Sequence, residues 1–197
     1  DDAVVFLAGG GVVPASRYAR FLGTAVPELR RHRDIVLVDQ RGTGRSNPLD
    51  CASNTESLAD LTESDARQMA QLKACLAGLE GDVRLYTTTI AMDDLDDVRA
   101  HLGYDHINLY GGSYGTRAAQ VYLRLFPERV RTIVLDGVVP QTLALGSEHA
   151  AKLDQSIYRV LAACDEDPDC GAAFPDTGRK LGELAARLEQ NPVEVAL

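Results

Sequence analysis

The stretch Ile107–Tyr110 (INLY) runs directly into Gly111–Gly115 (GGSYG), and this junction decides the fold of the chain. The first four residues predict a buried strand, and the segment after them predicts a helix from Tyr114 to Phe126, before Pro127. The turn between them has the pattern G-x-S-x-G, which after a strand and before a helix indicates a nucleophile elbow. Glycines at its two ends leave room where the strand and the helix come close.

Ser113 is the candidate nucleophile in this turn. The helix that begins at Tyr114 directs its N-terminal amides and the positive end of its dipole toward Ser113, where an oxyanion would develop. A glycine-rich turn whose serine only caps a helix would have the same letters. The strand before the turn and the helix after it favour the elbow over that alternative.

Strand-like and helix-like segments alternate on both sides of this junction. Further strands are predicted over Ala3–Ala8, Asp34–Asp39 and Arg131–Leu135. A continuous apolar run, such as the first of these, is typical of a parallel strand buried on both faces. Further helices are predicted over part of Ser16–Leu29, over Ser64–Leu79 and over Thr89–Leu102. The alternation predicts an α/β protein whose parallel sheet carries helices on both faces.

The pattern changes after Pro140. Only helices are predicted beyond it, over Ser147–Ala163 and Thr177–Gln190, with Cys164–Pro175 between them. We therefore predict a boundary near Leu145, with a sheet-containing core at residues 1–145 and a helical segment at residues 146–197.

Composition and charge exclude several classes of protein. Hydrophobic residues make up 45% and charged residues 25%, which is the balance of a globular protein rather than a disordered one. No apolar stretch approaches the roughly 20 residues that span a bilayer. We expect any targeting peptide to lie outside these 197 residues. The net charge of −9, without a basic stripe, argues against a nucleic-acid partner.

The four cysteines favour disulfides over a metal site. No Cys-x-x-Cys pair and no zinc-like histidine spacing is present. An even number of cysteines suits disulfides and therefore an oxidising compartment, which predicts a secreted or periplasmic protein. Buried free thiols are the alternative. Of the three possible pairings, the most economical joins Cys51 to Cys75 and Cys164 to Cys170.

A second glycine-rich turn, Gly9–Gly11, follows the first predicted strand. An oxyanion hole needs a backbone amide from a neighbouring loop, and glycines let that backbone approach a substrate. In a loop expected to face Ser113, the three glycines indicate such an amide.

Several segments together resemble the α/β-hydrolases of the prolyl aminopeptidase and tripeptidyl aminopeptidase family. They are Asp39–Ser46 (DQRGTGRS), Tyr86–Thr88, Asp94–Arg99, Leu109–Thr116 (LYGGSYGT) and Val134–Gly137. The resemblance covers about residues 3–140, and the cysteine-bearing helical stretch after it is similar to the lid of the secreted members. The resemblance implies an α/β-hydrolase fold, followed by the start of a helical lid.

The same resemblance implies a serine hydrolase that releases residues from peptide N-termini through an acyl-enzyme on Ser113. It also implies an oxyanion hole formed by the backbone amides of Tyr114 and Gly10. We predict no cofactor and no metal ion. Ala8 and Gly11 replace the His and the Pro of the family's glycine-rich loop, which loosens the assignment to peptidases.

The rest of a catalytic triad is harder to place. In the family, the acid and the histidine follow two further strands beyond the lid, so this sequence is expected to be the middle of a larger enzyme. An internal triad would use Asp136 and His149, but His149 opens a predicted amphipathic helix, where a solvated histidine is commoner. His32, His101 and His106 are expected at the surface, at the end of the sheet opposite Ser113.

Two further groups of charged residues have structural interpretations. The acidic cluster of Asp93, Asp94, Asp96 and Asp97 is expected to complement the dipole of its helix rather than to bind a metal ion. Asp39 and Arg41 are expected to hold the loop after the second strand.

Three functions remain open. The first is an exported aminopeptidase-like serine hydrolase with a peptide substrate. The second is a carboxylesterase with a small ester substrate, because the same elbow attacks ester carbonyls. In both, a downstream segment or a second chain would supply the triad histidine and acid. The third is a catalytically incomplete fragment or binding module that lacks them.

Overall fold

The structure is a computed structural model that describes residues 2–51, 65–144 and 146–193. The chain divides into two compact units, unit 1 over Asp1–Gln141 and unit 2 over Thr142–Leu197. The boundary predicted near Leu145 falls on a residue outside the described ranges. The assignment of residues 1–145 to a core and of residues 146–197 to a lid segment stays a prediction.

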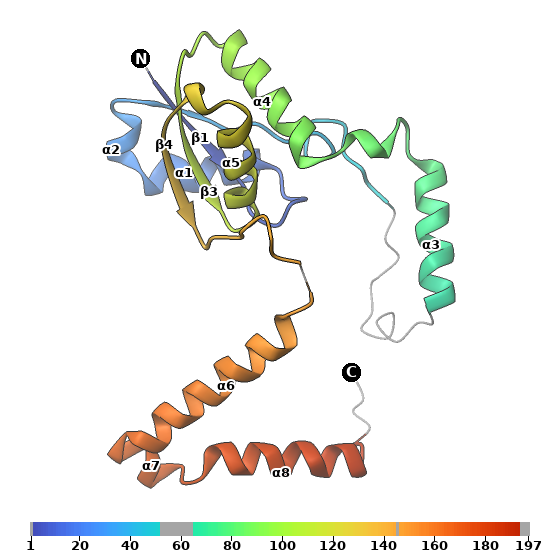
Figure 1. Cartoon of the computed structure of the whole chain (residues 1–197), viewed down its shortest axis with the longest axis vertical. Coiled ribbons are helices and arrows are strands. Elements are labelled where there is room, and N and C mark those ends of the chain that lie inside the picture. Colours follow the sequence, from blue (N-terminus) through green and yellow to red (C-terminus); the bar gives the residue numbers. More distant parts are fainter. Residues whose placement is uncertain (1, 52–64, 145, 194–197) are drawn as a thin grey trace. The chain divides into compact units, whose positions relative to one another are not determined.

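Among the residues that the structure describes, unit 1 contains a four-stranded parallel sheet in the order β2-β1-β3-β4. Figure 1 labels β1, β3 and β4 of this sheet. The strands are β1 (Ala3–Leu7), β2 (Asp34–Val36), β3 (Ile107–Gly112) and β4 (Val130–Asp136). β1 and β3 are the central pair, and Leu7 lies opposite Gly111 in their register. Because all four strands are parallel, their carboxyl ends lie at the same end of the sheet, where β3 leads into Ser113. The predicted parallel sheet is confirmed.

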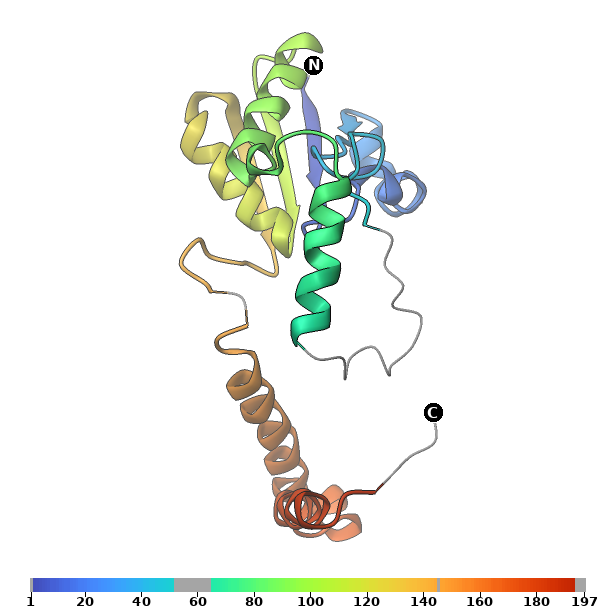
Figure 2. The ribbon, with the colours of Figure 1, turned by 90° about the vertical axis from the view of Figure 1, so that its right-hand side faces the viewer.

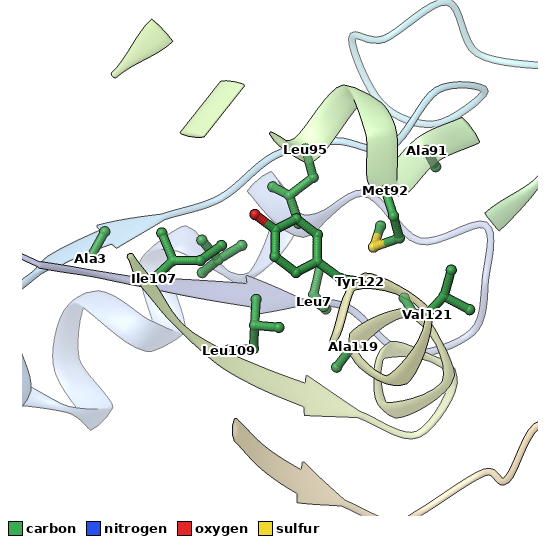
Figure 3. Packing of buried hydrophobic residues seen from close by; sticks show 12 residues of the cluster. Ala3, Leu7, Ala91, Met92, Leu95, Ile107, Leu109, Ala119, Val121 and Tyr122 are labelled. Atoms are coloured by element: carbon green, nitrogen blue, oxygen red, sulfur yellow. The ribbon is translucent and has the colours of Figure 1, made fainter. Parts of the chain in front are cut away.

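One face of the sheet is covered by α4 (Thr88–His101) and α5 (Tyr114–Leu125). Each helix buries an apolar stripe, and alternate residues of β1 and β3 point toward these stripes. Figure 3 shows the resulting cluster, which consists of Ala3, Val5, Leu7, Ala91, Met92, Leu95, Ile107, Leu109, Ala118, Ala119, Val121 and Tyr122. No member is more than 5% exposed, so this layer is the main hydrophobic core of unit 1.

The opposite face is covered by the short elements η1 (Ala15–Tyr18), α1 (Ala19–Ala25) and α2 (Pro27–Arg30). In Figure 2 the strands lie between these blue elements and the green and yellow helices α4 and α5. On this face the ring centroid of Phe6 lies 5.1 Å from that of Tyr18 and 5.5 Å from that of Tyr110. The predicted helices on both faces of the sheet are confirmed.

One strand of unit 1 ends earlier than the sequence predicts, and another lies exposed at the edge of the sheet. β2 ends at Val36 rather than at Asp39. Beyond it, the Asp39 carboxylate accepts hydrogen bonds from the amide and the hydroxyl of Ser16, at 2.8 and 2.9 Å. Val134 in β4 is 51% exposed, because β4 is the outermost strand of the described sheet. It is therefore not buried on both faces as a central strand would be.

Unit 2 consists of α6 (His149–Glu166), α7 (Pro168–Ala173) and α8 (Thr177–Gln190). α7 lies where only a connection was predicted. The carboxylate of Asp167 caps it by accepting hydrogen bonds from the amides of Asp169 and Cys170, and Pro168 occupies its first position. An acidic cap followed by proline is a helix-start signal, but the helix is too short to show an apolar period.

Both predicted disulfides are present. Cys51 pairs with Cys75 of α3 (Asp65–Gly78), and Cys164 of α6 pairs with Cys170 of α7. The predicted helix Ser64–Leu79 begins at a residue outside the described ranges, and α3 accounts for the remainder up to Gly78. Within the described ranges, no helix combines the length and the apolar character needed to cross a membrane.

A hydrogen bond from Tyr122 of α5 to an ion-paired carboxylate joins α5 to α4. Asp96 of α4 accepts hydrogen bonds from Nε of Arg99 at 2.6 Å and from the hydroxyl of Tyr122 at 2.7 Å. The hydrogen bond from Arg99 lowers the pKa of Asp96 below its usual value of 3.8, against the opposing effect of burial. Burial, followed by the hydrogen bond to Asp96, raises the pKa of Tyr122.

We expect this cluster to make unit 1 less stable in acid. The folded-state pKa of Asp96 lies below the unfolded-state value, so its stabilisation is complete above about pH 4 and is lost as the pH falls through the folded-state pKa. The free energy of unfolding, measured with urea from about pH 7 to about pH 2.5, should therefore fall less steeply in Asp96→Asn than in wild type. Asp97→Asn, at an exposed position of the same helix, should keep the wild-type slope. Equal slopes in Asp96→Asn and wild type would contradict this prediction.

Candidate active site

Ser113 occupies a strained turn between β3 and α5. Its φ is 51° and its ψ is −115°, a backbone conformation that residues other than glycine seldom adopt. Its side chain makes no capping hydrogen bond to α5, and the residue is exposed to solvent. Ser113 is thus exposed at the carboxyl end of the sheet. Its side chain does not cap α5, as it would if the serine only capped a helix in a glycine-rich turn.

Two glycines make this turn sterically possible. A Cβ on Gly111 would collide with the carbonyl oxygen of Gly115, and a Cβ on Gly115 would collide with the carbonyl oxygen of Leu7 in β1. The start of α5 therefore passes directly against β1 and β3. The close approach of strand and helix that the sequence predicts at these glycines is confirmed.

Thr116 holds the turn from the helix side. The carbonyl oxygen of Ser113 accepts hydrogen bonds from the amide and the hydroxyl of Thr116, at 2.9 and 2.6 Å. The hydroxyl of Thr116 in turn accepts a hydrogen bond from the amide of Val139, at 2.8 Å. The amide of Ser113 donates to the carbonyl oxygen of Asp136 at 2.8 Å. The turn is thereby fixed to the end of β4 and to the loop after it.

Replacement of Thr116 by valine should lower the free energy of unfolding by about 1–3 kcal/mol. Thr116 is fully buried, and the variant leaves the amide of Val139 without its acceptor. Urea unfolding followed by circular dichroism measures the change. Thr24→Val, at an exposed position in α1, is the matched control and should shift stability by less than about 0.5 kcal/mol. Equal stabilities of the two variants would rule out this role for Thr116.

The glycine loop after β1 lies against the serine. A Cβ on Gly9 would lie 3.3 Å from the Cβ of Ser113 and 3.3 Å from the carbonyl oxygen of Gly112. Gly10 and Gly11 have φ values of 78° and 71°. Proline holds φ near −65°, so it could not occupy position 11 in this backbone. The backbone at position 11 is therefore one that the glycine of this chain allows and that the family's proline would not.

The residues predicted to form an oxyanion hole belong to these two neighbouring segments. Tyr114 is the first residue of α5, so its amide is among the N-terminal amides of a helix that have no acceptor within the helix. Gly10 precedes Gly11, and the side chain of Tyr114 lies 3.6–3.8 Å from where a Cβ of Gly11 would be. The roles of Ser113, Tyr114 and Gly10 stay predictions.

Asp39 and Arg41 hold the loop after β2. Asp39 accepts the two hydrogen bonds from Ser16 and a third from the amide of Arg45, at 3.2 Å. Nε and Nη2 of Arg41 donate to the carboxylate of Asp94 at 2.6 and 2.5 Å, and this ion pair raises the pKa of Arg41. Both residues thus have the structural contacts that the sequence predicts.

The acidic cluster of α4 has a different explanation from the one predicted. None of its four carboxylates lies in the first turn of the helix, where the dipole acts. Asp94 instead binds Arg41, and Asp96 binds Arg99 and Tyr122. Among the residues that the structure describes, no group of three or more His, Cys, Asp or Glu side chains could hold a metal ion.

The histidines of unit 1 lie away from Ser113. His32 and His106 precede β2 and β3 and are exposed, so they lie near the amino ends of the strands. His101 is the last residue of α4, and the first residue of α4, Thr88, contacts Tyr114. Because a 14-residue helix is about 20 Å long, His101 lies far from the elbow. The expected surface position of these three histidines is confirmed.

The two residues of the possible internal triad each have a local partner. Asp136 accepts a hydrogen bond from the hydroxyl of Tyr110 at 2.7 Å. His149 belongs to unit 2, where its Nδ1 accepts a hydrogen bond from the amide of Gly146 at 2.8 Å. His149 is exposed, as expected for a solvated histidine at a helix start.

Two cavities of unit 1 lie at opposite ends of the sheet. The larger, about 920 Å³, is lined by polar residues near the amino ends of the strands, including Asp34 and His106. The smaller, about 460 Å³, is lined by the glycine loop at Gly11 and by Leu49 and Tyr86. Only the smaller adjoins the loop that lies against Ser113, so we regard it as the cavity relevant to the site.

Sequence reasoning interpreted Thr88 only as part of a helix cap and assigned no role to Thr116. The hydroxyls of Thr88 and Tyr114 are 2.7 Å apart, although 26 residues separate them in the chain. No local sequence pattern predicts this hydrogen bond, because the bond depends on how α4 packs beside α5. Thr116 follows the G-x-S-x-G motif directly, so its position in the first turn of α5 was the available signal.

Comparison with known proteins shows which chains this one is similar to. A family model described as the alpha/beta hydrolase fold matches residues 2–171. The chain is 38% identical over 118 residues to a tripeptidyl aminopeptidase of Streptomyces lividans, covering 54% of this chain and 22% of that protein. It is 31% identical over 135 residues to a proline iminopeptidase of Neisseria gonorrhoeae, covering 68% and 32%. A solved α/β hydrolase from a deep-sea metagenome library is 20% identical, with a TM-score of 0.47, covering 95% of this chain and 57% of its own.

This chain belongs to the α/β-hydrolase-fold family. The resemblance to tripeptidyl aminopeptidases and prolyl aminopeptidases is confirmed by the two curated relatives. The chain spans less than a third of the length of either of them.

Proposed function

We propose that this chain is the nucleophile-bearing part of an aminopeptidase-like serine hydrolase, with Ser113 as the nucleophile. The observation that carries the proposal is the backbone conformation of Ser113, an exposed serine at φ 51° between β3 and α5. Strain of this kind persists where the surrounding structure fixes it, and it is concentrated at functional sites. The named activities of the relatives support peptides as the substrate class.

In the proposed reaction, the hydroxyl oxygen of Ser113 attacks the carbonyl carbon of the scissile bond. A histidine base takes the hydroxyl proton, and the backbone amides of Tyr114 and Gly10 bind the oxyanion that forms. The carbon–nitrogen bond then breaks, the leaving amine takes the proton from the histidine, and an acyl-enzyme remains on Ser113. Water, deprotonated by the same histidine, attacks the acyl carbon; the ester bond to the oxygen of Ser113 breaks, the histidine returns the proton to that oxygen, and the acid leaves.

We further propose that the histidine and its acid come from sequence outside these 197 residues. The surface positions of His32, His101 and His106 support this proposal, as does the greater length of the relatives. We also propose that the protein is secreted or periplasmic, which is supported by its two disulfides.

A carboxylesterase is the second candidate, and the path of the loop at Gly11 favours it. Gly11 has a φ of 71°, which the family's proline could not adopt, and it directly follows Gly10, the proposed second oxyanion donor. Such a change alters which acyl group and which leaving group fit the site, while the elbow itself serves esters and amides alike.

Cleavage of matched substrates by the full-length protein distinguishes the aminopeptidase from the carboxylesterase. Release of nitroaniline from a tripeptide nitroanilide with a free N-terminus, but not from its acetylated counterpart, supports the aminopeptidase. Cleavage of a nitrophenyl acyl ester alone supports the esterase. Cleavage of neither, with no adduct from a fluorophosphonate probe, would mean that the chain belongs to a non-catalytic module.

A further inference from the structure

The side chain of Tyr114 connects three segments around the elbow. The residue itself begins α5, its hydroxyl lies 2.7 Å from the hydroxyl of Thr88, and its ring lies against Gly11. Thr88 is the first residue of α4. Both Tyr114 and Thr88 are half-buried, so this hydrogen bond is partly shielded from water.

The helix cap of α4 does not explain Thr88. The preceding residue, Thr87, is the cap, because its side chain accepts a hydrogen bond from the amide of Ile90 at 3.3 Å. The hydroxyl of Thr88 is directed to Tyr114 instead. The two adjacent threonines thus make different contacts: Thr87 caps α4, and Thr88 joins α4 to Tyr114 at the elbow.

The position of Tyr114 matters because the two proposed oxyanion donors belong to different segments. The amide of Tyr114 belongs to α5, and the amide of Gly10 belongs to the loop after β1. Three consecutive glycines have no side chains with which to fasten that loop, and their backbone is unusually free. The ring of Tyr114 is a side chain in contact range of the loop at Gly11, the residue after Gly10.

We propose that Thr88 is a positioning residue for the oxyanion hole. Its hydroxyl fixes the phenol of Tyr114, the phenol keeps the ring against Gly11, and the ring sets the separation of the two donor amides. This inference rests on the proposed function. It assigns the pair Thr88–Tyr114 a task in the rate of acyl transfer, which displacements below 1 Å already change strongly.

The test compares adjacent threonines in the full-length protein. The rate of labelling by a fluorophosphonate probe is measured as a function of probe concentration, which separates the maximal rate from the half-saturating concentration. Thr88→Val should lower the maximal rate about tenfold, with the half-saturating concentration unchanged within about twofold. Tyr114→Phe should have the same effect, and Thr88→Ser should restore the wild-type rate. Thr87→Val, the matched control, should label at the wild-type rate although it lacks the cap.

The outcomes distinguish the inference from the function on which it rests. A wild-type protein that takes up no probe overturns the proposed function, and the inference with it. A labelled wild type in which Thr88→Val reacts as fast overturns the inference alone. Equal slowing of Thr87→Val and Thr88→Val also overturns it, because the effect would then come from the start of α4. If Thr88→Val does not fold, Tyr114→Phe and Thr88→Ser decide the question in the same way.

Discussion

Replacement of Ser113 by alanine is expected to abolish turnover in the full-length protein, with a fall in rate of at least about 10⁴-fold. The hydroxyl oxygen is the proposed attacking atom, and no other side chain follows β3 in the same exposed turn. The backbone of the turn is compatible with alanine at no greater strain than with serine, since both carry a Cβ at φ 51°. The variant should therefore fold normally and lose only the chemistry. Turnover of the nitroanilide and of the nitrophenyl ester measures the effect.

The control for this experiment is Ser156→Ala. Ser156 is exposed on α6, and its hydroxyl donates to the carbonyl oxygen of Lys152 within the same helix. Its loss should leave turnover within about twofold of wild type. Ser113→Ala protein that keeps turnover within tenfold of wild type would contradict the assignment of the nucleophile.

The second large effect is expected from Gly115→Ala, which should destabilise unit 1 by about 3 kcal/mol or prevent its folding. The added Cβ would enter the space of the carbonyl oxygen of Leu7, and backbone cannot move aside as a flexible side chain can. Relief would require α5 to move away from β1, which opens the main hydrophobic core around Tyr122. Urea unfolding of this chain, monitored by circular dichroism, measures the loss.

Gly23→Ala is the matched control. Gly23 lies inside α1, and a Cβ there would meet nothing within 4 Å. The substitution should raise the free energy of unfolding by about 0.4–1 kcal/mol, because alanine restricts the unfolded chain and favours the helix. Equal stability of Gly115→Ala and Gly23→Ala would mean that the helix and the sheet do not approach as closely as described.

The sheet could be predicted because its decisive segments carry strong local signals. Ile107–Tyr110 is apolar, is bounded by turn residues and leads into a motif with a steric requirement for glycine. The contact of Asp39 beyond β2 could not be predicted, because its partner Ser16 lies 23 residues away. The short helix α7 was missed because six residues are too few to show a period.

The candidate site likewise contains residues that the local sequence predicts and contacts that it does not. Ser113 was predicted because the G-x-S-x-G motif, between a strand and a helix, specifies a tight turn with the serine exposed in it. The partner of Asp94 in α4 was not, because the local sequence shows the acidic residue but not the distant arginine that packs beside it. Asp94 was assigned to the helix dipole, whereas Arg41, 53 residues away, binds it. Thr88 and Tyr114 are likewise brought together only by the packing of two helices.

The most direct test of the central claim is to locate the covalent adduct on the full-length protein. After reaction with a fluorophosphonate probe and digestion with trypsin, Ser113 lies in the peptide from Ala100 to Arg117, which also contains Tyr104, Tyr110 and Tyr114. Fragment-ion masses should place a single phosphonyl group on Ser113, and heat-unfolded protein should carry none. An adduct on one of the tyrosines, or a folded protein without any adduct, would contradict a nucleophilic serine at this elbow.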